Sequence, residues 1–167
     1  MKRTYLIFFL CAMLLLISCN KKNDDILSYS SDEIYLKCVD YINIIKGFPK
    51  ELLIFESEEQ LEYALNEYEC FASLSELSAI MADYPIGEYI YILQYFERSY
   101  GSKVTCKRLN IDKVEMTIHL ENKTKTQFLK KDNPTAESGY ITYAVLPKEY
   151  LSGYDFSNQQ GVLYLGK

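Results

Sequence analysis

The chain has 167 residues, of which 49% are hydrophobic and 25% are charged, and this composition fits one ordinary globular domain. It excludes extended disorder and a collagen-like repeat. The formal net charge of −5 argues against a general nucleic-acid binder, because binding to phosphates depends on clustered Lys and Arg.

Residues 1–19 have the order of a secretory signal, in which basic residues precede an apolar run, here Leu6–Ile17, and small residues follow it. The apolar run is shorter than the roughly 20 residues that a membrane-spanning helix needs. Leu16-Ile17-Ser18-Cys19 resembles the lipobox of bacterial lipoproteins, in which the cysteine is acylated and becomes the first mature residue. A plain secretory signal or an uncleaved anchor is the alternative. We therefore expect a signal peptide at 1–18, lipidation of Cys19 and attachment to a membrane through that lipid.

Residues 19–32 are rich in Asn, Asp, Ser and Lys, and we expect them to form the lipidated cysteine and a flexible tether. Within this segment, Asn20–Asp25 resembles the signal that directs some Bacteroidetes lipoproteins to the outside of the outer membrane. A solvated linker of mixed charge is the alternative. The expected location is the outer membrane, with the domain facing the cell surface or the periplasm.

Residues 33–167 are expected to form a single domain. Glu33–Lys46 fits either a helix or a strand, because its apolar residues have helical spacing while its Val and Ile favour a strand. Glu51–Glu56 is a short apolar run that is typical of a buried strand. Two short helices follow, one begun by the Ser57 to Gln60 capping pattern and one by Ser73–Glu76.

The second half of the chain predicts strands. Glu88–Arg98 is β-branched and aromatic on both faces, as in a central strand that is covered on two sides. Lys103–Leu109 and Lys113–Glu121 form a predicted hairpin that turns near Ile111. In the second arm, alternation predicts inward side chains at Val114, Met116, Ile118 and Leu120.

Asn122–Ser138 is polar and is expected to be a mobile connection. Tyr140–Leu146 predicts another strand, Glu149–Gly161 looks irregular, and Val162–Leu165 is a candidate edge strand. Together these elements predict an α+β fold, with short N-terminal helices packed on a mostly antiparallel β-sheet.

Cysteine usage does not select a disulfide. Once Cys19 is lipidated, Cys38, Cys70 and Cys106 remain in the domain, and three thiols allow either one pair with a leftover or no required disulfide. We favour the latter, because each lies among apolar residues. Closely spaced metal-ligand motifs such as Cys-x-x-Cys are absent from the sequence, so no metal or other cofactor is predicted.

No catalytic constellation is found in the sequence, so we expect a protein that is not an enzyme. The only histidine, His119, falls on the polar face of its strand, and a nucleophilic pair with Cys106 is disfavoured because the two side chains should point to opposite faces. The glutamates of residues 56–69 fit a solvated helix face better than paired catalytic carboxylates. The basic stretch Lys123–Lys131 could contact an acidic partner or a polysaccharide, or could be a solvated loop.

Tyrosine is the one strong composition signal, with 16 residues. Tyr89, Tyr91 and Tyr95 share one strand face, where core filling is favoured over an exposed platform. Tyrosines in predicted turns are better candidates for an interface, because an apolar ring with a polar tip suits such a place. These candidates are Tyr100, Tyr150 and Tyr154.

Several short motifs stand in order along the domain: Val39–Gly47, Leu52–Leu61, Tyr84-Pro85, Tyr89–Tyr95, the hairpin, and Tyr140–Pro147. In this order they resemble the PrcB-like lipoproteins, which are related to the accessory subunit of a surface protease complex. Tyr100-Gly101-Ser102 stands near the place where that group has a Gly-Gly-Tyr turn. The resemblance implies a non-catalytic domain that assists or binds an envelope protein. Our hypothesis is therefore a protein-binding, membrane-anchored lipoprotein, and the alternative is a glycan- or small-ligand-binding surface lipoprotein with a Tyr-lined pocket.

Overall fold

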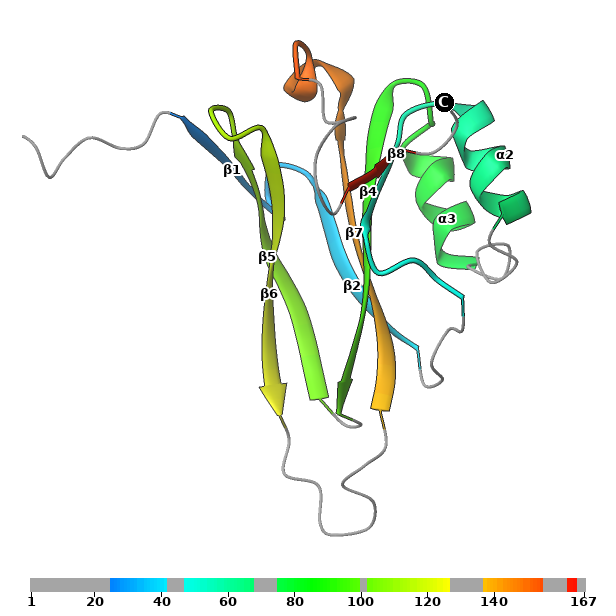
Figure 1. Ribbon diagram of the computed structural model, residues 1–167, viewed down its shortest axis with the longest axis vertical. Helices are drawn as coiled ribbons and strands as arrows, with labels where there is room; N and C mark the ends of the chain where they lie inside the picture. Colours follow the sequence, from blue (N-terminus) through cyan, green and yellow to red (C-terminus); the bar gives the residue numbers. More distant parts are fainter. Residues whose placement is uncertain are drawn as a thin grey trace, which may run out of the picture.

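The computed structural model describes residues 25–41, 47–67, 75–99, 102–126, 137–154 and 162–164. Within these residues the chain forms three layers: two helices, a five-stranded sheet and a three-stranded sheet (Figure 1). The predicted α+β class with mostly antiparallel strands is confirmed, but the strands divide into two sheets where one was expected. The elements are β1 (Ile26–Ser30), β2 (Tyr35–Tyr41), β3 (Leu52–Phe55), α2 (Glu58–Glu67), α3 (Ser75–Asp83), β4 (Tyr89–Ser99), β5 (Ser102–Asp112), β6 (Thr117–Thr126), β7 (Glu137–Pro147), a 3₁₀-helix (Lys148–Leu151) and β8 (Val162–Tyr164).

The five-stranded sheet has the order β2-β7-β4-β3-β8, so β4 is its central strand, as its composition predicted. All pairs are antiparallel except β3 with β8, which is parallel. The ambiguous segment after Glu33 resolves as a strand, because β2 pairs with β7 from Tyr35 opposite Val145 to Tyr41 opposite Gly139. The predicted edge strand near the end of the chain is β8.

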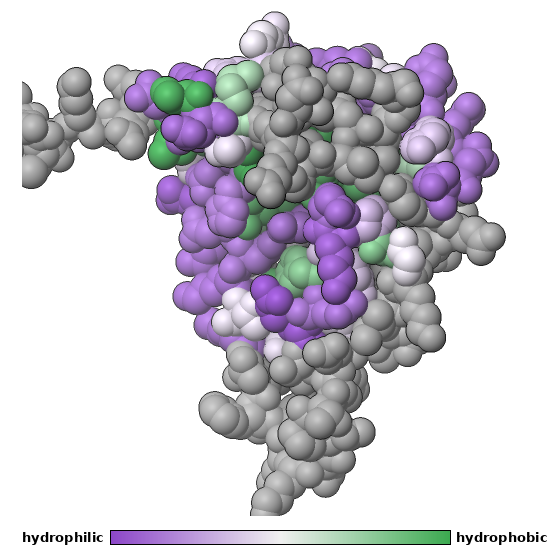
Figure 2. Space-filling view, in the orientation of Figure 1, coloured by the Kyte–Doolittle hydropathy of each residue, from purple (hydrophilic) through white to green (hydrophobic). Residues whose placement is uncertain are grey.

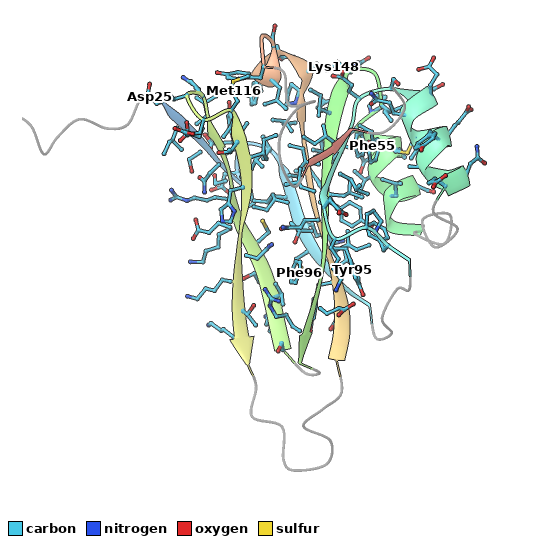
Figure 3. All side chains as sticks on the ribbon, in the orientation of Figure 1. Asp25, Phe55, Tyr95, Phe96, Met116 and Lys148 are labelled. Atoms are coloured by element: carbon cyan, nitrogen blue, oxygen red, sulfur yellow. The ribbon has the colours of Figure 1, made fainter. Side chains whose placement is uncertain are left out.

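Side chains alternate across this sheet, and each face has its own core. Figure 3 shows the alternation on β4, where Tyr95 points toward the helices and its neighbour Phe96 toward the three-stranded sheet. The buried residues of the helix-side cluster are Phe48, Leu53, Phe55, Leu61, Ala64, Leu77, Ile80, Tyr91, Leu93, Tyr95, Ile141, Tyr143 and Val145. The buried residues of the inter-sheet cluster are Ile34, Leu52, Ile54, Ile90, Ile92, Leu109, Ile111, Leu120, Ala144, Leu146 and Leu151.

Helix α2 begins as its capping pattern predicted. The Gln60 amide N–H donates to Ser57 Oγ at 3.3 Å, and Gln60 Oε1 in turn accepts from the Glu56 amide at 2.7 Å. Glu58 and Glu59 lie in the first turn, where the positive end of the helix dipole stabilises carboxylates. Both predicted helices are present, although the Ser73 cap of the second lies outside the described residues.

The three-stranded sheet has the order β1-β5-β6, and β1 was not predicted. The tether prediction for residues 19–32 is therefore wrong for Ile26–Ser30, which pair with β5 from Ile26 opposite Asp112 to Ser30 opposite Arg108. Leu27 and Tyr29 provide the physical reason, since they pack against the inter-sheet cluster and give the strand an apolar inner side.

The β5–β6 hairpin is present, but its predicted register is wrong. Cys106 lies opposite Asn122 rather than opposite residue 116, because β5 continues to Asp112 and a β-bulge follows Cys106. Asp112 Oδ1 accepts from the Val114 and Glu115 amides, each at 2.9 Å, and so begins the turn later than expected.

Two side chains that were predicted to point inward from the second arm therefore lie in the turn instead. Val114 is 68% exposed in the turn, and Met116 ends the turn with φ at 52°. The alternation holds from Thr117 onward: Leu120 is buried, while His119 and Glu121 are exposed. The polar segment 122–138 also begins and ends within strands β6 and β7, and the rest of that predicted connection lies outside the described residues.

Polar residues occupy one part of the space between the two sheets. Thr142 is fully buried and its Oγ1 donates to Asn122 Oδ1 at 3.0 Å. Asn122 Nδ2 donates in turn to Gln94 Oε1 at 3.3 Å, and Tyr140 Oη donates to the Ser102 carbonyl at 2.6 Å. These bonds join β4 and β7 to β5 and β6, and they satisfy polar groups that would be costly to bury alone.

Candidate binding site

A pocket of about 260 Å³ opens at one end of β2. Strand β2 contributes Tyr35, the segment between α3 and β4 contributes Tyr84, and β4 contributes Tyr89. The remaining walls come from the β1–β2 turn and the end of β7. We call this site the tyrosine pocket; its lining is completed by Ser31, Asp32, Glu33, Ile34, Val145 and Pro147.

The three tyrosine rings of the pocket form a series of contacts in which the ring of Tyr84 lies between the other two. Tyr35 and Tyr84 have ring centroids 5.3 Å apart at 57°, and Tyr84 and Tyr89 have centroids 5.3 Å apart in an edge-to-face arrangement at 84°. The main chain of Tyr84 is also fixed, because its carbonyl accepts a hydrogen bond from the Tyr91 hydroxyl. The pocket therefore has a preorganised aromatic wall, since each ring restrains the next.

Two carboxylates stand at the rim of this wall. Glu33 Oε2 accepts from both the Ser30 amide at 2.8 Å and the Ser30 hydroxyl at 3.0 Å. These hydrogen bonds hold the pKa of Glu33 below its ordinary value, with a smaller contribution from nearby Arg108. Asp32 is exposed beside it. The rim is thus acidic at neutral pH, next to three tyrosine rings.

The sequence alone did not identify the tyrosine pocket. Tyr35 lay in the segment that fitted either a helix or a strand, and Tyr84 served only as a signal for the end of a helix. The antiparallel pairing of β2 with β7 and of β7 with β4 brings these distant residues to one corner of the sheet. A run of tyrosines near turns was the only available signal.

Of the sequence-predicted interface residues, Tyr150 and Tyr154 are described and Tyr100 lies outside the described residues. Tyr150 stacks on Tyr29 of β1 with centroids 5.1 Å apart at 18°, and Tyr154 packs against the inter-sheet cluster. Burial and these two neighbours raise the pKa of Tyr29. Both residues use part of their rings to close the end of the sandwich, and neither lines the tyrosine pocket.

The remaining predicted positions are dispersed. Cys19 and Cys70 lie outside the described residues. Cys38 and Cys106 are free thiols in the described part of the chain, and burial raises the pKa of both, that of Cys106 to about 12. A thiol with this pKa is not a nucleophile at neutral pH. His119 is exposed on β6 and pairs with Asn110, away from Cys106, so the two do not form a catalytic pair.

Among the described residues, no group of three or more His, Cys, Asp or Glu side chains could hold a metal ion. No helix in that same part of the chain is long and apolar enough to cross a membrane. The glutamates of α2 at positions 58, 59, 62 and 67 are exposed, as expected for a solvated face.

Comparison with known proteins leaves the geometry as the basis for function: no protein-family model, no curated protein and no solved structure matches this chain.

Proposed function

We propose that this protein is a lipid-anchored envelope protein whose domain is a non-catalytic binding module, and that the tyrosine pocket receives a basic side chain of a partner protein. The observation that carries this proposal is the contact series of Tyr35, Tyr84 and Tyr89 beside the carboxylates of Asp32 and Glu33. Aromatic faces attract ammonium and guanidinium groups, and a nearby carboxylate adds a charge-assisted hydrogen bond. The pocket thus offers both contacts to one Lys or Arg.

The size of the pocket favours a protein partner over a free small molecule. Its volume of about 260 Å³ is below the range of roughly 300–1,000 Å³ that is usual for small-molecule sites. A single side chain projecting from a larger surface would fill it, while the partner's remaining surface would contact the surrounding residues. The resemblance to PrcB-like accessory lipoproteins supports the same kind of role.

Capture of the partner from native membranes under mild cross-linking tests the proposal. We expect one or more proteins to be recovered reproducibly with the wild-type chain and lost with Tyr84→Ala. Tyr63→Ala is the matched control, because Tyr63 is 48% exposed on α2 and lies outside the pocket. Recovery of the same proteins with all three chains would refute the role of the pocket, and recovery of no reproducible partner would refute the binding function.

The chemistry of the pocket can be tested separately with short peptides. A peptide containing Lys or Arg should bind measurably tighter than the same peptide with norleucine, and Asp32→Asn should reduce this difference. Circular dichroism should show that the variant is folded. Equal affinity for the charged and uncharged peptides would contradict a site for a basic side chain.

A second candidate function, glycan binding, is favoured by the presence of a concave Tyr-lined pocket, since aromatic rings also stack on sugars. Screening against neutral oligosaccharides separates the two. Sugar binding that is lost in Tyr84→Ala but unchanged in Asp32→Asn would support the glycan site.

Lipidation has its own test. Cys19→Ala should abolish incorporation of a labelled fatty acid and should release the protein from membranes after cell fractionation. Retained acyl labelling would refute lipidation at Cys19.

A further inference from the structure

The two outer layers of the molecule have opposite charge. The acidic residues of α2 and α3 are Glu58, Glu59, Glu62, Glu67, Glu76 and Asp83, and neither helix contains a Lys or Arg. On the opposite side, most of the charged residues of the three-stranded sheet are Lys or Arg, although the whole chain has a formal net charge of −5. The charge is therefore separated across the sandwich and not mixed over its surface.

The cations gather on the outward face of β5 and β6. Register places Lys103 directly opposite Lys125, and Lys123 opposite Thr105. All four of these residues are exposed, and Lys107 is exposed at the bulge. We call Lys103, Lys107, Lys123 and Lys125 the lysine face. Figure 2 shows that hydrophilic residues dominate the side of the molecule formed by these strands.

Two residues of the lysine face, Lys103 and Lys125, have no opposite charge across the hairpin. Like charges directly across two strands are destabilising, and Lys103 and Lys125 are such a pair. In the register of β5 with β6, the carboxylate of Glu121 lies opposite Arg108 and not opposite either lysine. Arg108 also lowers the pKa of nearby Glu33. A cluster that the fold leaves unneutralised in this way is suited to an anion outside the chain.

We propose that the lysine face docks on an anionic membrane surface. A sheet face presents its cations on a plane, which fits an array of lipid head groups better than a single ligand. The distance to the lipid also fits, and this step rests on the proposed acylation of Cys19. Seven residues at roughly 3.5 Å each keep Ile26 within about 25 Å of Cys19.

An apolar residue supports the same orientation. Ile26 is 41% exposed and alternates with inward Leu27 and Tyr29, so it lies on the outward side of the sheet that carries the lysine face. One acyl chain or apolar contact gives weak attachment, and a basic patch adds the second attraction that makes binding stable. The acidic helical layer would be repelled from the same surface, so only one orientation is favoured.

This orientation leaves the tyrosine pocket accessible. Tyr35, Tyr84 and Tyr89 pack against the helix-side cluster, on the other face of the five-stranded sheet from β5 and β6. The membrane would therefore hold one side of the domain while the pocket faces away from it.

Vesicle co-sedimentation tests the proposal with the mature chain, residues 19–167, carrying Cys19→Ala so that no lipid contributes. We expect binding to phosphatidylcholine vesicles that contain phosphatidylglycerol, little binding to pure phosphatidylcholine, and loss of binding as salt is raised. Replacing Lys103, Lys123 and Lys125 by Gln should weaken partitioning on the order of 100-fold. Replacing Lys50, Arg98 and Lys148 by Gln removes the same charge outside the three-stranded sheet and should change it little.

Three results would overturn the proposal: equal binding to neutral and anionic vesicles, equal loss in both triple variants, or binding to soluble dextran sulfate with none to vesicles. Circular dichroism of both variants excludes unfolding as the cause. None of these measurements depends on acylation or on the tyrosine pocket. Failure here is thus distinguishable from failure of partner capture or of acyl labelling.

Discussion

The two faces of the central sheet are packed by different kinds of side chain. Toward the helices, the buried cluster includes Phe48, Phe55, Tyr91, Tyr95 and Tyr143. Toward the three-stranded sheet, the buried cluster consists of Ile, Leu and Ala in the described residues, and the buried ring of Tyr140 stacks on Phe96 in the polar part of the inter-sheet space. Two packed sheets interdigitate the side chains of their inner faces, and under the helices aromatic rings such as those of Phe55 and Tyr91 stack on each other. The two buried clusters therefore differ mainly in their content of aromatic rings.

The largest expected effect on stability comes from substituting two neighbouring residues of β3 that face opposite layers. Phe55 is fully buried and stacks on Tyr91 with ring centroids 5.2 Å apart, so Phe55→Ala should lower the free energy of unfolding by about 4 kcal/mol. Ile54 is 1% exposed on the other face, and Ile54→Ala should cost about 3 kcal/mol. Urea denaturation measures both.

Ile26→Ala is the exposed control for this pair and should change stability by less than about 0.5 kcal/mol. A larger loss for Ile54→Ala than for Phe55→Ala would reverse the comparison, and would mean that the aliphatic core between the sheets contributes more to stability than the aromatic one.

An intermediate effect is expected in the polar part of the inter-sheet space. Asn122→Ala leaves the buried Thr142 hydroxyl without its acceptor and should cost about 1–3 kcal/mol. The double variant Asn122→Ala with Thr142→Val should cost less than the two single effects added together, because no donor is then stranded. Additive losses in this double-mutant cycle would show that the hydrogen bond between the two side chains contributes nothing.

The smallest effect concerns the rim of the tyrosine pocket and pH. Hydrogen bonds from Ser30 lower the pKa of Glu33 below its ordinary value of 4.5, so folding favours the ionised form. The stabilisation is present above pH 4.5 and is lost as the pH falls through the lower pKa of the folded state. Protection of the Ser30 amide against hydrogen exchange, relative to an unstructured peptide at the same pH, should therefore fall at acid pH more than it does in Glu33→Gln. Identical pH profiles in the two chains would contradict this role.

Local sequence patterns predicted those elements whose structure depends mainly on residues close together in the chain. The Ser57 to Gln60 cap located α2, and the two-sided apolar composition of residues 88–98 identified β4 as central. Strand β1 was missed because outward Ser28 and Ser30 resemble linker residues, and its partner β5 lies far along the chain. The predicted hairpin register was wrong because the turn at Asp112 depends on side-chain hydrogen bonds and a β-bulge follows Cys106. The alternation of hydrophobic residues indicates neither feature.

The candidate site was less predictable than the fold. Turn position made Tyr150 an interface candidate, and it gave no sign that the ring stacks on Tyr29, a contact that only the pairing of β1 makes possible. Tyr35 contacts Tyr84 because only β7 separates β2 from β4 in the sheet, which brings β2 close to the segment before β4 although the two are far apart in sequence. The large number of tyrosines indicated the chemistry of the site, but only the sheet topology shows where the site lies.

Strand β1 also has a mechanical consequence. Tension applied to the residues before Asp25 reaches the domain first through the Lys113 amide bonded to the Asp25 carbonyl at 2.7 Å, and then through the ladder with β5. A pull along the strand loads these bonds together in shear, whereas a pull perpendicular to it opens them one after another. Since β1 lies at the edge of its sheet, the direction of load would decide whether this first strand holds or peels away while both cores stay intact.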